Sequence, residues 1–223
     1  MILRYISVVT LLVAGFSTHA AIQNPFDITD ISITEVQAAH APELLIANDC
    51  SKMGNTGPMV DIGWDEIINM GEKVWKIIEA GKPVVHLETP VANALPRGLK
   101  CWSDLDGWQA PQTRSLEVVY TNGFGIEVVK FRFRLHYTYG GGKNQRGRYL
   151  TNVTVLPSEL NVMWGYTFDA HVEVGQAINL GSANDPLAGL EMNVRWNLKT
   201  VIKESQNSFH FFVQGDGALK TAR

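Results

Sequence analysis

The stretch from Val129 to Tyr139, VKFRFRLHYTY, decides the fold class. Its apolar side chains recur at every second position, and cationic or polar residues occupy the positions between them. Because successive side chains of a strand point to opposite faces, this pattern predicts an amphipathic β-strand. At about a dozen residues the predicted strand is long, since most strands have about five or six.

The same alternation occurs on both sides of this stretch. A strand over residues 116–120 precedes it and ends at Asn122-Gly123, a pair typical of hairpin turns. Further strands are predicted over residues 148–156, 160–174, 190–200 and 208–214, with loops over residues 140–148 and 175–186. Residues 116–214 are therefore predicted to form about six antiparallel strands, each with one apolar and one polar face.

The first half, residues 21–115, lacks such alternation and is predicted to be irregular, apart from a short strand near Ile33 and one helix over residues 62–80. Apolar residues in the helical segment follow one stripe with a period of 3.6. The stripe comprises Trp64, Ile67, Ile68, Val74, Trp75 and Ile78. The stripe indicates a helix packed on a sheet, and a helix that lies on a membrane is the alternative. The polar face of this segment carries both charge signs, whereas a membrane-bound helix usually has a basic polar face.

These elements predict a mainly β fold: an antiparallel, β-sandwich-like sheet with one amphipathic α-helix packed on it. A two-layer α+β body is the alternative, because a sheet with one apolar face must bury it against something. The chain of 223 residues is short enough for residues 21–223 to form a single β-rich domain.

Residues 1–20 have the layout of a secretory signal peptide, which would be removed on export. Arg4 precedes an apolar run from Tyr5 to Phe16, and the segment ends at the small residue Ala20. The run is too short for a membrane anchor, and no later stretch approaches the necessary length of about 20 residues. We therefore expect a secreted or periplasmic protein with no transmembrane segment in the mature chain.

The chain has two cysteines, Cys50 and Cys101. In an exported protein they are expected to form a disulfide bond, which would close a loop of about 52 residues and contribute about 4 kcal/mol in the chain-entropy model. Two buried thiols are the alternative. The bond would lie in the irregular first half and leave the strands to be held by packing.

Composition excludes several function classes. The formal net charge of −3 argues against a nucleic-acid partner, which usually requires a basic excess. Motifs for a nucleophile with its base, a P-loop or a dinucleotide site are absent from the sequence, so an enzyme is the less favoured prediction and no cofactor is expected. Metal ligands two residues apart on a strand lie about 7 Å from each other, so no metal site is predicted.

Two groups of residues are candidates for binding. The first group lies in loops and consists of an aromatic pair and a basic cluster. The alternative for the aromatic pair is a plug over the core. The alternative for the basic cluster is a solvated hairpin tip. The group comprises Trp102, Trp108, Lys143, Arg146 and Arg148. The second lies on polar strand faces, where opposite charges are expected to pair across neighbouring strands unless they form a site. It comprises Arg132, Arg134 and His136 with Asp169, His171 and Glu173.

The sequence therefore predicts a secreted or periplasmic, non-catalytic, β-rich binding protein. Its partner is an unidentified protein, a glycan or a lipid surface. Two alternatives remain open at this point: a membrane-active protein of the pore-forming type, and a hydrolase with a dispersed site.

Overall fold

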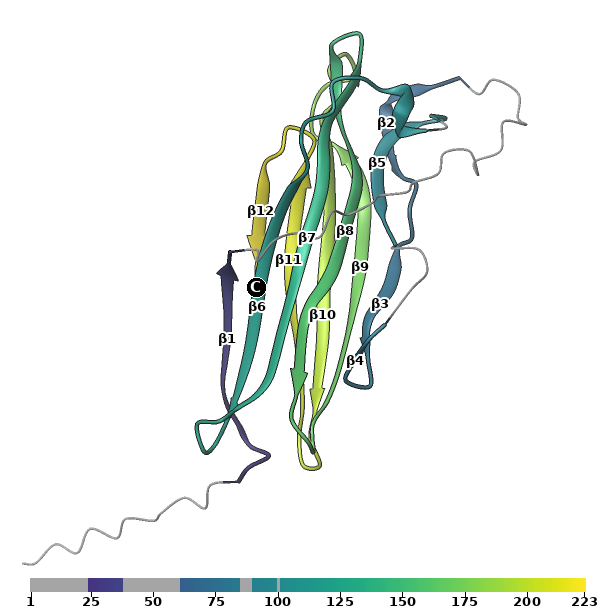
Figure 1. Cartoon of the computed structure of the whole chain (residues 1–223). Coiled ribbons are helices and arrows are strands. Elements are labelled where there is room, and N and C mark those ends of the chain that lie inside the picture. Colours follow the sequence, from purple (N-terminus) through teal and green to yellow (C-terminus); the bar gives the residue numbers. More distant parts are fainter. Residues whose placement is uncertain (1–23, 38–60, 85–89, 100) are drawn as a thin grey trace, which may run out of the picture.

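The computed structural model describes residues 24–37, 61–84, 90–99 and 101–223. This part of the chain contains twelve strands and one short 3-10 helix, η2 (Figure 1). In chain order they are β1 (Ile28–Val36), β2 (Gly63–Asn69), β3 (Val74–Glu79), β4 (Lys82–Pro83), β5 (Ala92–Arg97), η2 (Trp102–Asp104), β6 (Gln112–Asn122), β7 (Glu127–Lys143), β8 (Arg146–Val162), β9 (Thr167–Asn179), β10 (Ala188–Lys199), β11 (Glu204–Gln214) and β12 (Leu219–Ala222).

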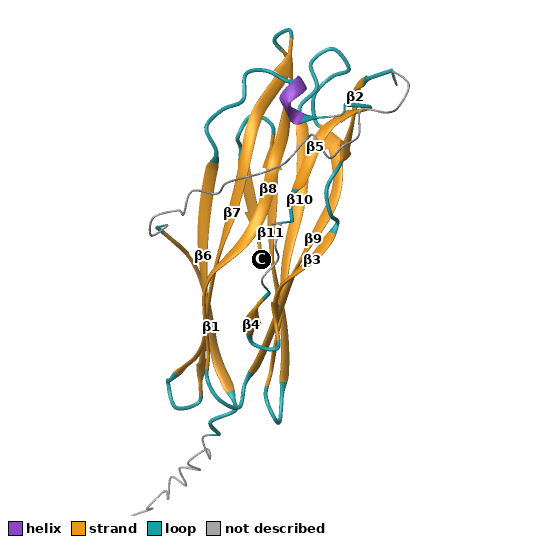
Figure 2. Ribbon diagram, turned by 45° about the vertical axis from the view of Figure 1, so that its right-hand side comes forward, coloured by secondary structure: helices purple, strands orange, loops and turns teal. Residues whose placement is uncertain are grey.

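The strands form two six-stranded antiparallel sheets that pack face to face (Figure 2). The first sheet has the order β1-β6-β7-β8-β5-β2, and the second has the order β12-β11-β10-β9-β3-β4. The chain changes sheet between β2 and β3, returns between β4 and β5, and changes again at the turn between β8 and β9. The predicted mainly β, sandwich-like fold is therefore confirmed.

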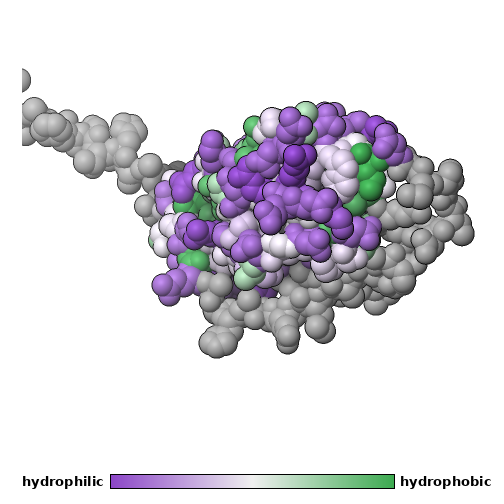
Figure 3. Space-filling model, turned by 90° about the horizontal axis from the view of Figure 1, so that it is seen from above, coloured by the Kyte–Doolittle hydropathy of each residue, from purple (hydrophilic) through white to green (hydrophobic). Residues whose placement is uncertain are grey.

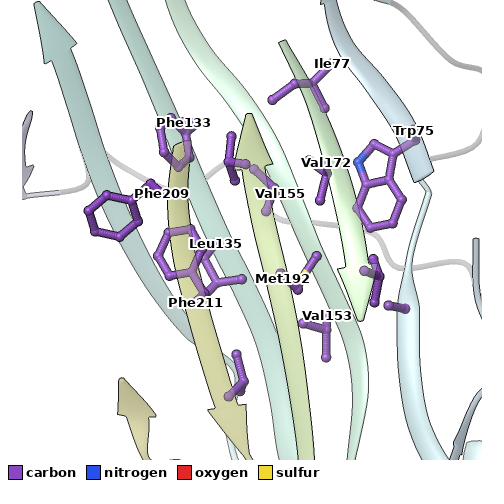
Figure 4. Close-up of a cluster of buried hydrophobic side chains, with 14 of the residues drawn as sticks. Trp75, Ile77, Phe133, Leu135, Val153, Val155, Val172, Met192, Phe209 and Phe211 are labelled. Carbon is purple, nitrogen blue, oxygen red and sulfur yellow. The ribbon is translucent and has the colours of Figure 1, made fainter. Parts of the chain in front are cut away.

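One hydrophobic core fills the space between the two sheets (Figure 4). The apolar face of β7 supplies Phe131, Phe133 and Leu135, all fully buried. From the second sheet, Trp196 and Phe211 pack against Phe133, with ring centroids 6.3 and 6.2 Å away. The period-two pattern thus works as expected, because residues two apart, such as Phe131, Phe133 and Leu135, point to the same face of the strand.

The predicted helix over residues 62–80 is wrong: the segment forms β2 and β3, which belong to different sheets. Two residues distinguish the patterns, since a helical stripe would bury Val74 and expose Ile77. In the structure Val74 is 61% exposed and Ile77 is 4% exposed. The crossing between the strands is made at Gly71, where a Cβ atom would lie 1.9 Å from the carbonyl oxygen of Val91.

Other boundaries also differ from the prediction. The region expected to be irregular contains β5, which lies inside the first sheet between β8 and β2. The alternation over residues 160–174 is divided between β8 and β9 by a turn at Gly165, whose φ is +87°. The predicted loop over residues 140–148 shrinks to a two-residue turn, Asn144-Gln145, with φ of 53° and 62°. The short strand predicted near Ile33 is present as β1.

Antiparallel hairpins place the turns at two opposite ends of the sandwich. The upper end in Figure 1 carries the β7–β8, β9–β10 and β11–β12 turns, and the lower end carries the β6–β7, β8–β9 and β10–β11 turns. No helix in the described ranges is long and apolar enough to cross a membrane.

Candidate functional site

A cleft of about 720 Å³ opens at the upper end of the sandwich. Its walls come from three parts of the chain: the start of β2, the tip of the β7–β8 hairpin, and the loop between β9 and β10. The side chains that matter most for binding are Trp64, Asp65, Lys143, Arg146, Tyr149 and Asn184. Seen from above, this end is mostly hydrophilic (Figure 3).

Hydrogen bonds to neighbouring strands fix the β2 wall. The buried Tyr149 hydroxyl on β8 donates to the carbonyl oxygen of Trp64 at 2.7 Å. Asn179 at the end of β9 donates to the carbonyl oxygen of Asp65 at 3.1 Å. Burial, followed by the charges of Asp65 and Asp185, raises the pKa of Tyr149 to about 12. Tyr149 therefore stays protonated at neutral pH and acts as a donor rather than as a base.

The β9–β10 loop is held against the hairpin by one carboxylate. Asp185 accepts a hydrogen bond from the Gly147 backbone N–H at 3.1 Å and pairs with Arg148 at 3.2 Å. The backbone N–H of Arg148 also donates to the carbonyl oxygen of Pro186 at 2.9 Å. Both walls are thus organised before any ligand arrives, which reduces the entropy cost of binding.

Two exposed cations stand at the mouth of the cleft. Lys143 donates to the carbonyl oxygen of Asp104 at 3.2 Å, and its ammonium lies 3.9 Å from the exposed carboxylate of Asp106. An ion pair this exposed contributes little to stability, so it does not hold the Lys143 ammonium firmly. Arg146 has no ion pair with any residue that the structure describes. Towards a ligand the cleft therefore presents a guanidinium that no described residue pairs with and a weakly held ammonium.

The loop with Trp102 and Trp108 lies behind the hairpin rather than in the cleft. The two half-buried rings meet edge to face, with centroids 6.2 Å apart, and both pack against the core. Trp108 covers Gly141, where a Cβ atom would lie 2.3 Å from the indole. The pair supports the hairpin that carries the cations.

Sequence reasoning therefore found only part of the cleft. The predicted residues Lys143 and Arg146 line it, and Arg148 braces its wall. The sequence does not point to Trp64 and Asp65, because the spacing of apolar residues at the start of β2 suits a helix. Tyr149 lies on a strand that the sequence does predict, and it joins the site only because β8 and β2 meet at the cleft. An alternation was present at the start of β2: Ile62 and Trp64, two residues apart, both line the cleft.

The charged strand faces do not form the expected pairs. The prediction that β7 cations pair with Asp169, His171 and Glu173 is wrong, because β7 and β9 belong to different sheets. Arg132 instead pairs with its cross-strand neighbours in the first sheet, Glu117 on β6 and Glu159 on β8.

On the outer face of β9, the acidic residues also have local partners. Glu173 pairs with Arg195 on β10 at 3.0 Å and lies 3.3 Å from His171. Asp169 accepts a hydrogen bond from the Ala80 backbone N–H at 2.7 Å. Within the described ranges, no three His, Cys, Asp or Glu side chains gather as a metal site.

Arg134 and His136, expected on a solvated face, are only 8% and 7% exposed. His136 Nδ1 lies 3.1 Å from the Thr113 hydroxyl, while His136 Nε2 and Arg134 Nε are buried without a hydrogen-bond partner in the described structure. Burial, followed by the charge of Arg134, lowers the pKa of His136.

The lowered pKa of His136 makes stability depend on pH. An unfolded histidine titrates near pH 6.5, whereas the folded one takes up its proton only at lower pH. The unfolded state therefore binds more protons as pH falls below about 6.5, and the free energy of unfolding decreases. We expect His136→Gln to lose less stability between pH 7 and 5 than the wild type. Urea unfolding at several pH values measures this, and equal pH slopes would contradict it.

Two predictions fall outside the described residues: the signal peptide over residues 1–20, and Cys50 as the partner of Cys101. The disulfide bond therefore stays a prediction. Comparisons of the chain with protein-family models, with curated proteins and with solved structures find no significant match.

Proposed function

We propose that this chain is an exported, non-catalytic binding protein whose upper-end cleft takes an acidic oligosaccharide. The expectation of export rests on the sequence of residues 1–20. The observation that carries the binding proposal is the cleft itself. Arg146 stands at its mouth with no ion pair to a described residue, and hydrogen-bonded walls surround it.

The chemistry of the walls supports a sugar ligand. Trp64 supplies an aromatic surface for a sugar ring, and Asp65 and Asn184 supply polar groups for hydroxyls. Lys143 and Arg146 supply the positive charge that a carboxylate on the sugar requires, and a guanidinium can bind a carboxylate through two hydrogen bonds. Because the cleft is open at the surface, it suits one end or a short stretch of a chain.

Charge removal at the mouth tests the proposal. The double variant Lys143→Gln/Arg146→Gln is expected to weaken binding of a uronic-acid oligosaccharide by about 10- to 100-fold, since each of the two exposed contacts contributes about 0.7–1.4 kcal/mol. Titration calorimetry with oligogalacturonate measures the affinity, and a neutral oligosaccharide of the same length is the ligand control.

The matched control is Lys82→Gln/Lys203→Gln, which removes two charges elsewhere. Both residues are exposed, and both lie near the lower end. This control is expected to keep the wild-type affinity. Equal weakening by both double variants, or no binding of oligogalacturonate by the wild type, would contradict the proposal.

A further inference from the structure

The lower end of the sandwich exposes apolar side chains on three successive hairpin turns. Trp164 is 89% exposed and Val201 is 74% exposed. The set, called the apolar tips below, comprises Phe124 and Ile126 between β6 and β7, Met163 and Trp164 between β8 and β9, and Val201 and Ile202 between β10 and β11. Exposed apolar residues scattered singly are ordinary, but a concentration at one end of a molecule marks an interaction site.

The topology gathers these side chains at one end. Because β6 to β11 run alternately up and down, every second turn falls at the lower end (Figure 1). The β6–β7 turn belongs to the first sheet, the β10–β11 turn to the second, and the β8–β9 turn joins them. The apolar tips therefore extend across both layers, opposite the hydrophilic end that holds the cleft (Figure 3).

The backbone at the tips is already hydrogen-bonded from within. The Asn122 side-chain oxygen accepts from the N–H groups of Phe124 and Ile126, at 3.0 and 3.1 Å. The Thr200 hydroxyl oxygen accepts from the N–H groups of Ile202 and Lys203, at 3.3 and 2.9 Å. An N–H group without a hydrogen-bond partner is costly to transfer from water into the membrane. Because these N–H groups are already paired within the turns, their transfer does not carry that cost. They are also occupied, so they offer no edge to a peptide that adds as a strand.

The β8–β9 tip is braced so that Trp164 stays exposed. Phe26 packs on Tyr166 with ring centroids 5.9 Å apart, and the Tyr166 hydroxyl donates to the carbonyl oxygen of Pro25. Tyr166 N–H donates back to the Met163 carbonyl at 3.2 Å, which closes the turn. A rigid turn presents Trp164 without the entropy cost of ordering the backbone of the turn.

The chemistry at this end matches a lipid surface. Tryptophan favours the boundary between headgroups and acyl chains, and lysine can extend its ammonium to lipid phosphate. Lys199 and Lys203 flank the β10–β11 tip, are exposed, and have no ion pair with a described residue. Separate tips from two layers also suit a fluid surface that closes around each, rather than a rigid partner with matching pockets.

We propose that the lower end of the sandwich docks on a phospholipid bilayer by inserting the apolar tips into its interface. The cleft at the opposite end then faces away from the membrane. The proposal is independent of the oligosaccharide proposal, because it uses different residues at the other end of the strands.

Vesicle flotation of the exported form, residues 21–223, tests the docking without the apolar run at residues 5–16. Two compositions are used: phosphatidylcholine alone, and phosphatidylcholine with phosphatidylglycerol. We expect the wild type to float with both, and the variant Trp164→Ser/Val201→Ser to bind at least tenfold more weakly to both. Because both side chains are exposed, the urea midpoint of this variant should equal that of the wild type.

The matched control removes two exposed apolar side chains away from the lower end. Val74→Ser/Leu180→Ser is expected to float like the wild type, since Val74 lies on β3 and Leu180 follows β9 at the upper end. If the wild type floats with neither composition, or if the tip variant floats as well as the wild type, the proposal is overturned. Binding to anionic vesicles alone that Lys199→Gln/Lys203→Gln abolishes and the tip variant retains would also overturn it.

Discussion

Phe133→Ala is expected to lower the free energy of unfolding by about 3–5 kcal/mol, the usual cost of removing a buried phenyl ring. Phe133 is fully buried at the centre of β7. Its ring stacks on Phe131 with centroids 5.0 Å apart and contacts Trp196 and Phe211 of the facing sheet. The cavity would therefore open between the two layers, where neither sheet can close it without moving the other.

The midpoint of urea unfolding measures this effect, and an unchanged slope with denaturant would show that the same surface is exposed on unfolding. Phe133→Leu keeps most of the apolar volume and is expected to cost less than half as much. It also supplies a folded comparison if the alanine variant is too unstable to purify. Phe124→Ala removes the same ring from an exposed tip and should change stability by no more than about 0.5 kcal/mol. A similar loss in Phe124→Ala and Phe133→Ala would contradict the assignment of the core.

The second half of the fold was predictable because its strands are long and half-buried. In β7 and β10, apolar and polar residues alternate over about ten residues, Val129–Tyr139 and Leu190–Lys199, and no helix fits that period. The segment with β2 and β3 was not predictable, because its tryptophans and isoleucines occur at spacings that suit a helix as well. What decides between the two is the pairing of β2 with β5 and of β3 with β9, and these contacts lie far apart in the sequence.

The candidate sites follow the same division. Lys143 and Arg146 could be predicted, since a basic cluster in a turn is visible in the sequence. Trp64 reaches the same cleft only because β2 lies beside the hairpin in space, which local pattern cannot reveal. Each apolar tip is likewise one or two hydrophobic residues in a turn. Only the alternation of strand direction brings the three turns to one end.

Gly215→Ala is expected to destabilise the fold by about 3 kcal/mol, at the high end of the range for overpacking. A Cβ atom at Gly215 would lie 1.9 Å from the carbonyl oxygen of Arg148 and 2.5 Å from its carbonyl carbon. Both are backbone atoms of β8, so they cannot rotate away as a side chain would. The Gly215 N–H also donates to the carbonyl oxygen of Ala188 at 2.8 Å, which fixes the end of β11 against β10. The added methyl group must therefore separate the two sheets at their upper end.

The same displacement should reach the cleft. The Arg148 side chain pairs with Asp185, and its backbone N–H donates to the carbonyl oxygen of Pro186. Moving the Arg148 backbone therefore shifts the β9–β10 wall. We expect Gly215→Ala to weaken oligogalacturonate binding as well as stability. Gly63→Ala is the stability control, because its Cβ would meet the Arg97 guanidinium at 3.3 Å, the movable end of a flexible side chain. Thermal unfolding of the two variants decides the point: if Gly215→Ala proved as stable as Gly63→Ala, the close approach of β8 and β11 would not exist.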